Sequence, residues 1–405
     1  MRSTEPDSID AETLIETCAV EALALLRENL GPLGFLAAAP GAAAQSRGYD
    51  RVFGRDAAIC ALAALHCGDR ALAAGARLSL ESLASRQAGN GQIPKYVDGR
   101  GGADFWYLGC IDATLWWLIA VQHAGLIGHL SEQVARALDW LACQEHPQFF
   151  LLQQNEASDW ADIMPRSGFV LYTNALWYHV KRIYALPHAA KTHEHFNYLF
   201  DPFADLRATH KRVRLMMHYV RRRRRHASPR ELYLSFVNLA SWGEEGDLFG
   251  NLLAVLFGLA GDHQTCRILA AIARNQAGAP YPMRVTQTPI QPAEPLWRPY
   301  MARHRQNLAH RYHNGGIWPF VGGFWVMALD LAGRRRQAET VLADLARASA
   351  AGGWQFNEWF HGLTGEPEGM PRQSWNAAMF LLARRSLSLP LFGRGIGNAY
   401  SLLEA

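Results

Sequence analysis

The 405-residue sequence has few charged residues and no long hydrophobic run. Charged residues make up 19% of the chain, below the roughly 25% that is usual for globular proteins, and apolar residues make up 49%. A disordered chain needs low hydrophobicity and a high net charge, so this composition excludes disorder. No apolar run approaches the roughly 18 residues that a membrane-spanning helix needs, and we expect no membrane partner.

The sequence also lacks the motifs of metal and cofactor sites. Its six cysteines form no Cys-x-x-Cys pair and no zinc-type spacing, and most stand in apolar helical patterns that are typical of buried free thiols. No phosphate-binding or calcium loop occurs, and the string GRGIGN at 393–398 has no strand before it. We therefore expect no metal and no cofactor. The polar, acidic N-terminal stretch is not a signal peptide, which indicates a cytoplasmic protein.

The net charge of +4 is a mild basic excess. Much of it comes from one stretch that contains Lys211, Arg212, Arg214, the run Arg221 to Arg225, and Arg230. We interpret this stretch as the solvated end of a helix and its loop. A nucleic-acid surface would interleave aromatic residues with the cations inside a recognisable module, and neither feature is present, so no nucleic-acid partner is expected.

Aromatic residues, by contrast, are abundant: the chain has 13 Trp, 13 Tyr and 18 Phe. A globular core needs far fewer Trp, so some of these rings should line something other than the interior.

Apolar residues recur at helical spacing in twelve stretches, whereas alternating β-branched runs are few and short. The predicted helices are 9–30, 55–67, 69–88, 110–124, 131–143, 169–184, 203–220, 249–260, 263–276, 316–332, 334–350 and 373–387. The links before the even-numbered helices are long and rich in Trp, Tyr, Gly and acids, whereas the other links are mostly short turns.

Helices that alternate in direction place all the long links at one end of the molecule. Six such hairpins predict an all-α fold, an (α/α)6 toroid with the even helices inside. We expect one domain over residues 1–405, with a core at about 9–387 and a short C-terminal tail. A solenoid of stacked hairpins, the alternative, would show a fixed repeat and evenly short loops.

A loop-rich end crowded with Trp and carboxylates is what a carbohydrate site needs. Eight Trp lie in or beside these loops: Trp106, Trp160, Trp242, Trp297, Trp318, Trp354, Trp359 and Trp375. Cleavage of a glycosidic bond needs two carboxyl groups, one protonated and one ionised. Two loops supply acids among aromatic residues. The first contains Glu156, Asp159 and Asp162, and the second contains Glu358, Glu366 and Glu368.

Several segments resemble a known family. The string RYHNGGIWPF, followed about 40 residues later by WQFNEWFHGLTGEPEG and QSWNAAMFLLA, resembles the C-terminal half of neutral/alkaline invertase-like hydrolases. It is equally similar to the catalytic domain of glycogen-debranching amylo-α-1,6-glucosidases. Upstream, YDRVFGRD, GQIPKY, ADFWYLGCIDATLWWL and SDWADIMPRSGFVLYTNALWY follow the same family order, so the resemblance runs from about residue 47 to 384.

The resemblance implies an inverting glycoside hydrolase with Asp162 as general acid and Glu358 as general base. In such enzymes the two carboxyls stand roughly 6.5–9.5 Å apart. Asp159 remains a second candidate for the acid. Arg55 and Asp56 would hold the innermost sugar, and the pocket would be lined by Asp112, Trp116, His313, Asn314, Trp318, Gln373 and Trp375. From the same loops we add Asp159, Trp160, Arg166, Trp297 and Trp359 as candidate substrate contacts.

The segment 281–311 departs from the strict invertase pattern, and Glu294 and Trp297 within it are candidate subsite contacts. Without an accessory sugar-binding domain, we expect a small carbohydrate substrate, such as sucrose or a short branched oligosaccharide. Homo-oligomerisation stays open. The alternatives are a sugar 2-epimerase that uses a pair among His310, His313 and His361, and a non-catalytic carbohydrate-binding scaffold.

Overall fold

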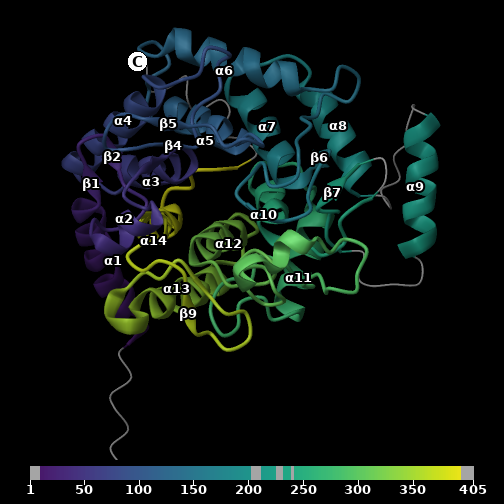
Figure 1. Cartoon of the computed structure of the whole chain (residues 1–405). Helices are drawn as coiled ribbons and strands as arrows, with labels where there is room; N and C mark the ends of the chain where they lie inside the picture. Colours follow the sequence, from purple (N-terminus) through teal and green to yellow (C-terminus); the bar gives the residue numbers. More distant parts are fainter. Residues whose placement is uncertain (1–9, 202–210, 225–230, 239–240, 394–405) are drawn as a thin grey trace, which may run out of the picture.

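Six helices form a closed inner ring (Figure 1). The computed structural model describes residues 10–201, 211–224, 231–238 and 241–393. The ring helices are α3 (Gly54–His66), α5 (Ile111–His123), α7 (Leu171–Ile183), α10 (Leu248–Leu256), α12 (Pro319–Leu331) and α14 (Ser374–Ser386). Each packs against the next, and α14 packs against α3, which closes the ring.

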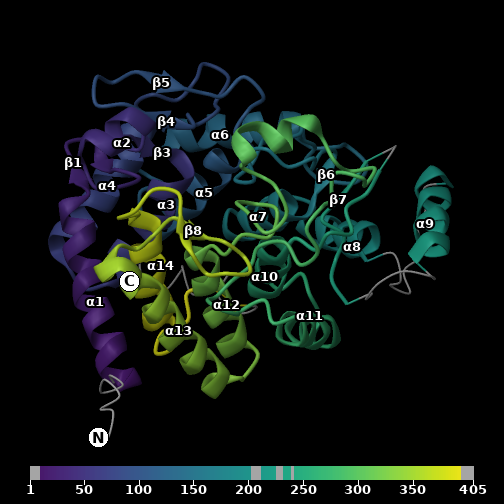
Figure 2. The same cartoon turned by 60° about the horizontal axis from the view of Figure 1, so that its bottom comes forward.

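An outer layer of helices covers this ring (Figure 2). It comprises α1 (Ala11–Glu28), α4 (Arg70–Ala84), α6 (Ser131–Gln144), α8 (Ala189–Phe200), α11 (Asp262–Arg274) and α13 (Arg335–Trp354). In sequence order these helices pack on α14, α3, α5, α7, α10 and α12. The predicted (α/α)6 toroid is confirmed.

Amino-acid patterning explains which helices lie inside. All residues of α10 are buried, and in α5 the buried run extends from Ile111 to Val121 because both sides of an inner helix are covered. The outer helix α6 buries only Val134, Ala137 and Leu141, which lie on one face at helical spacing. Among the described residues, no helix is long and apolar enough to cross a membrane.

The seventh predicted helix, 203–220, is wrong, because this stretch is not the outer helix that follows α7. The outer helix between α7 and α10 is α8 (Ala189–Phe200), whose first two turns are mostly polar and hide the helical period. Residues 203–210 lie outside the described ranges, and the rest of the prediction falls in α9 (Lys211–Arg224), at the periphery of the molecule (Figure 1). In α9, Val213, Met217 and Val220 are buried, which is the apolar period that suggested a helix there.

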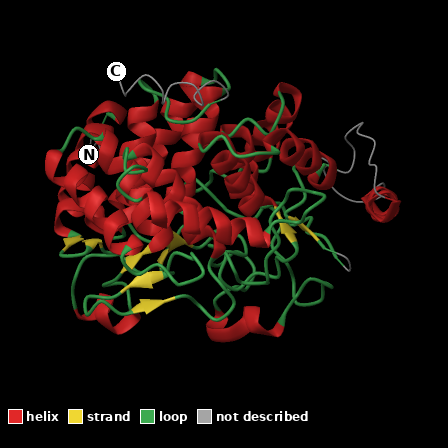
Figure 3. Cartoon of the chain, turned by 90° about the horizontal axis from the view of Figure 1, so that it is seen from above, coloured by secondary structure: helices red, strands yellow, loops and turns green. Residues whose placement is uncertain are grey.

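The long links carry the remaining elements. They contain the short helices α2 (Ala42–Arg47) and η1 (Pro299–Arg305), and two-residue antiparallel strands. The strands are β1 (Leu30–Gly31), β2 (Gly34–Phe35), β3 (Val52–Phe53), β4 (Tyr96–Val97), β5 (Ala103–Asp104), β6 (Phe169–Val170), β7 (Phe236–Val237), β8 (Trp359–Phe360) and β9 (Pro367–Glu368). Strands and loops gather at one end of the helices, as the loop lengths predict (Figure 3).

Close helix contacts inside the ring depend on small residues. Gly323 of α12 faces α14, and a Cβ atom at this position would lie 2.9 Å from the Met379 carbonyl oxygen. We expect Gly323→Ala to lower the free energy of unfolding by about 1–3 kcal/mol, as overpacking does. Chemical denaturation measures this. Gly128→Ala is the control, because a Cβ there meets no atom within 4 Å. Equal stability of the two variants would contradict the prediction.

Candidate active site

The predicted site residues converge because all six inner helices begin at the same end of the toroid. Arg55 and Asp56 lie in the first turn of α3, and Asp112 lies in the first turn of α5. Trp318 and Gln373 directly precede α12 and α14. Since a helix N-terminus carries a positive partial charge, this end of the ring favours acidic groups.

Glu358 is buried at this end, with an exposed fraction of 5%. The Tyr49 hydroxyl donates to its Oε1 over 2.7 Å, and the Met370 backbone N–H donates to its Oε2 over 2.8 Å. Burial raises the pKa of Glu358 to about 7; the two donors oppose this rise, and the nearby Asp56 and Asp162 add to it. Glu358 therefore changes its protonation state near neutral pH.

Asp162 shares this site but is more open, since its side chain is 30% exposed. Lys95 Nζ lies 3.7 Å from Asp162 Oδ1, and the Tyr312 hydroxyl donates to Oδ2 over 3.4 Å. Burial raises the pKa of Tyr312 well above its usual value, and the charges of both Asp162 and Glu358 add to this rise. Tyr312 therefore lies close enough to both predicted catalytic carboxylates for their charges to act on its hydroxyl group.

Arg55 joins two buried acids. Its Nη2 lies 3.2 Å from Asp56 Oδ1, and its Nη1 donates to Asp112 Oδ2 over 3.2 Å. The Tyr172 hydroxyl donates to the same Asp112 oxygen over 3.0 Å. Burial raises the pKa of Asp56, and Arg55 opposes that rise. The arrangement holds Asp56 in one orientation beside the two catalytic candidates.

Asp159, the second candidate for the acid, is engaged inside its own loop. Gln154 Nε2 donates to its Oδ2 and the Ala161 backbone N–H donates to its Oδ1, each over 2.8 Å. Burial raises its pKa to about 6. Both oxygens are occupied and the residue is buried, so Asp159 shapes the loop whereas the Asp162 side chain faces a more open space.

A cluster of aromatic rings surrounds these acids. His313 stacks on Trp318 with ring centroids 5.0 Å apart, and Trp160 meets both rings edge to face. Trp375 stacks on Phe320 at 4.0 Å. Trp160 Nε1, His313 Nδ1 and Trp375 Nε1 are buried and have no hydrogen-bond partner among the described residues. Unpaired buried polar nitrogen atoms of this kind suit a hydroxyl-rich ligand, whose hydroxyl groups both donate and accept.

Some predicted site residues are buried and support their neighbours. Trp116 is fully buried and donates to the Tyr172 hydroxyl. The Asn314 side-chain amide bonds the backbone of Ile290 and Asn307.

Arg166 is likewise buried, where it donates to Glu245 and pairs with Asp247. The sequence analysis did not single out these two acids. Trp359 lies in β8 and packs against Tyr312 and Arg311, whereas Trp297 is half-buried in the loop just before η1.

Sequence reasoning also missed Tyr49, Lys95 and Tyr312 as individual residues. All three stand in motifs that the sequence displays: YDRVFGRD, GQIPKY and RYHNGG. The motifs could therefore have suggested them, but the contacts that give them a role join distant segments of the chain.

The histidines of the epimerase alternative lie in different surroundings. His313 belongs to the aromatic cluster, and burial lowers its pKa. His310 lies against His361, whose Nδ1 accepts long bonds from the backbone N–H groups of Leu363 and Thr364 in its own turn. Within the described ranges, no group of three or more His, Cys, Asp or Glu is placed to hold a metal ion.

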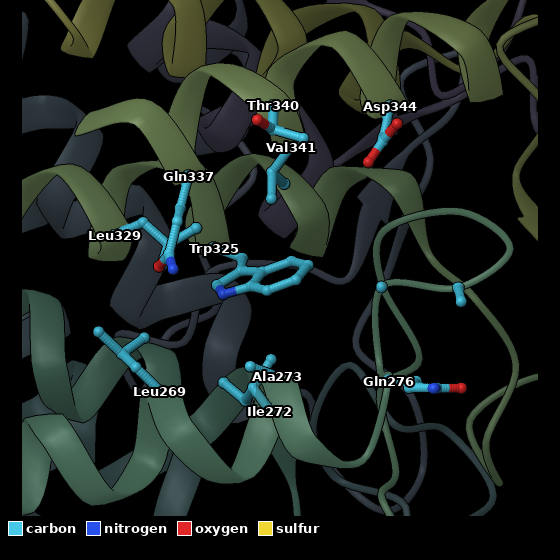
Figure 4. A pocket seen from close by; sticks show the side chains of 12 residues that line it. Leu269, Ile272, Ala273, Gln276, Trp325, Leu329, Gln337, Thr340, Val341 and Asp344 are labelled. Atoms are coloured by element: carbon cyan, nitrogen blue, oxygen red, sulfur yellow. The ribbon is translucent and has the colours of Figure 1, made fainter. Parts of the chain in front are cut away.

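A separate hollow of about 550 Å³ lies on the outside of the toroid, between α11 and α13 and over part of α12 (Figure 4). Trp325 forms its centre, and Leu269, Ile272 and Val341 are among the apolar residues that line it. None of the predicted site residues lines this hollow.

The chain is similar in sequence to invertases over part of its length. Residues 247–390 match the family of alkaline and neutral invertases. Cytosolic invertase 1 from Oryza sativa subsp. japonica is 27% identical over 146 residues, a match that covers 35% of this chain and 25% of the rice protein.

Solved structures share the fold over nearly the whole chain. A mannosylglycerate hydrolase from Thermus thermophilus, in complex with Tris and D-glycerate, has a TM-score of 0.62 at 15% identity, covering 90% of this chain and 99% of that one. The glucoamylase of Hormoconis resinae has a TM-score of 0.62 at 11% identity, covering 94% and 74%. The chain therefore has the (α/α)6 toroid fold that these glycoside hydrolases share, and its residues 247–390 are similar to the alkaline and neutral invertase family.

Proposed function

We propose that the protein is a glycoside hydrolase that cleaves a terminal α-glucosidic bond of a small sugar, with inversion at the anomeric carbon. The observation that carries this proposal is the pair of unlike carboxylates, the buried Glu358 and the partly exposed Asp162, in one aromatic-lined site. Two carboxyl groups in different environments can divide the roles of proton donor and proton acceptor.

In the proposed mechanism the terminal sugar occupies the closed end of the site, near Arg55 and Asp56. Asp162 protonates the glycosidic oxygen as the bond from that oxygen to the anomeric carbon breaks. Glu358 takes a proton from a water molecule that attacks the same carbon from the opposite face. The leaving group departs as a neutral alcohol, and the sugar is released with inverted configuration.

The surroundings of Glu358 suit the role of a base. Its pKa of about 7 makes the carboxylate a stronger proton acceptor than an ordinary glutamate, and the Tyr49 hydroxyl and the Met370 N–H hold it in place. Activity should therefore rise with pH as Glu358 loses its proton.

The substrate proposal follows the names of the similar proteins. We propose α-glucosidase, debranching α-1,6-glucosidase or invertase-like specificity, exerted in the cytoplasm. The rice relative is named a cytosolic invertase, which supports both the last of these specificities and the location.

The stereochemistry tests the mechanism directly. With a panel of α-glucosides, we expect NMR spectra in the first minutes to show β-glucose as the initial product. Initial α-glucose would exclude the single displacement. Exchange of ketose with aldose, or of epimers, without cleavage of any glycoside would favour the epimerase.

Substitution of the two carboxyls tests their roles. Asp162→Asn and Glu358→Gln should each lower kcat on ordinary glucosides by about 10²–10⁴-fold, because each removes a proton-transfer group. On α-glucosyl fluoride, whose leaving group needs little protonation, Asp162→Asn should recover much of its rate and Glu358→Gln should not.

Glu156→Gln is the matched control on the Asp162 loop, since Glu156 is paired with Arg298 and Tyr300, and it should keep most of the activity. Recovery of Glu358→Gln in place of Asp162→Asn would reverse the assignment.

Removal of the Tyr49 hydroxyl should shift the pH dependence. The hydroxyl stabilises the ionised form of Glu358, so Tyr49→Phe should raise the pKa of Glu358. The acidic limb of kcat/KM should then move to higher pH, by about one pH unit for a lost hydrogen bond to a charge. A limb that stays in place or moves to lower pH would argue against Glu358 as the base.

A further inference from the structure

A line of side chains leads outward from Asp162 along one wall of the site. Lys95 Nζ lies 3.7 Å from Asp162 Oδ1 and 4.3 Å from the centre of the Trp106 ring. The Trp106 ring lies 4.8 Å from that of Tyr107, which is 83% exposed. We call Lys95, Trp106 and Tyr107 the outer wall of the site. It adjoins the proposed proton donor on its open side, where the leaving group must lie if the terminal sugar occupies the closed end.

Backbone contacts fix this wall in place. The Lys95 N–H donates to the Asp104 carbonyl over 2.7 Å, next to the pairing of β4 with β5. Trp106 Nε1 donates to the Ala157 carbonyl over 3.0 Å, which ties the wall to the loop that carries Asp162. Trp106 also has a positive φ of 54°, a conformation that a bulky residue rarely adopts. The surrounding contacts hold the indole over Lys95 despite this cost.

The ammonium group of Lys95 has few contacts within the described part of the chain. Its side chain is only 16% exposed, and within the described part of the chain its ammonium group faces Asp162 at 3.7 Å without a hydrogen bond. Asp104 and Arg55 are the other charged side chains whose fields reach it. An ammonium group whose contacts are a carboxylate at 3.7 Å and the Trp106 ring can also donate to an acceptor on a bound leaving group.

The ammonium group of Lys95 also lies beside the carboxyl that is proposed to protonate the leaving group. A leaving group that reaches Asp162 therefore also reaches this positive charge. A negative group bound to Lys95 would offset that charge. The charges of Asp104 and Asp162 also act at this position, and they repel a ligand with one negative charge less than they repel a dianionic phosphate.

We propose that the outer wall is a leaving-group subsite that selects substrates whose leaving group bears a carboxylate. The carboxylate binds Lys95, and the carbon skeleton packs against Trp106 and Tyr107. This inference rests on the proposed hydrolase function and names the substrate class for the same site.

Two matched substrates test it: the 4-carboxyphenyl and 4-carbamoylphenyl α-glucosides, which differ in charge but little in shape. We expect the wild-type kcat/KM to be at least about tenfold higher for the carboxylate, as a charge-assisted hydrogen bond would give. Lys95→Met should bring the ratio close to one, and Lys95→Arg should keep a preference. Circular dichroism and thermal unfolding of each variant show whether it folds.

Arg51→Met is the matched control, because Arg51 lies over the ring of Tyr96 in β4 and is not part of the outer wall. It should leave the ratio unchanged. Equal hydrolysis of both substrates by the wild type, or an equal loss of preference in Arg51→Met and Lys95→Met, would overturn the assignment of the subsite to Lys95. Hydrolysis of neither substrate, nor of any other glycoside, would instead refute the proposed function.

Discussion

The constraint on which the site depends is the burial of the inner ring on both sides. A helix such as α10, with every residue buried, has no side face left for chemistry. Its free surface is its end, and the six inner helices all begin at the same end of the molecule. Polar residues therefore collect in the first turns and in the links that precede them. The low charge content of the chain follows from the same burial, because six helices have almost no contact with solvent.

Buried charge at this end must be neutralised locally, and the structure does so in two places. Arg55 lies between Asp56 and Asp112, and Arg166 lies between Glu245 and Asp247. Leaving one partner of such a group unpaired would be costly, so these contacts fix side-chain orientation more than they add stability. Near these paired acids, burial and the charges of Asp56 and Asp162 raise the pKa of Glu358.

The fold was predictable because its signal is repetitive. Twelve apolar stretches and the alternation of short and long links are enough to give a ring of hairpins, and eleven of the stretches fall where the structure has an inner or an outer helix of the toroid. The failure at α8 has a physical reason: its opening sequence, AAKTHEH, buries only Thr192 and therefore lacks an apolar period. The neighbouring stretch of α9 has that period, so the sequence predicts the seventh helix there and not at α8.

The site was predictable in its motifs but less so in its details. Residue type and order point to Asp162 and Glu358, yet no pattern in the sequence says that Trp116 and Asn314 are fully buried supports. Burial depends on which helices meet, and Lys95 comes to face Asp162 only because β4 pairs beside the loop before α3. Contacts between distant segments carry this information, and a single sequence does not contain it in readable form.

The two carboxyls differ in burial, and this difference suits the two roles proposed for them. A group that activates water must control one molecule, and the deep position of Glu358, between the Tyr49 hydroxyl and the Met370 N–H, leaves room for little movement. A group that protonates a leaving group must stand where that group can depart, and Asp162 is the more exposed of the two. Lys95, Trp106 and Tyr107 extend from Asp162, the more exposed carboxyl, and Tyr107 is open to solvent. Under the proposed roles of the two carboxyls, these three residues would contact the leaving group and not the terminal sugar.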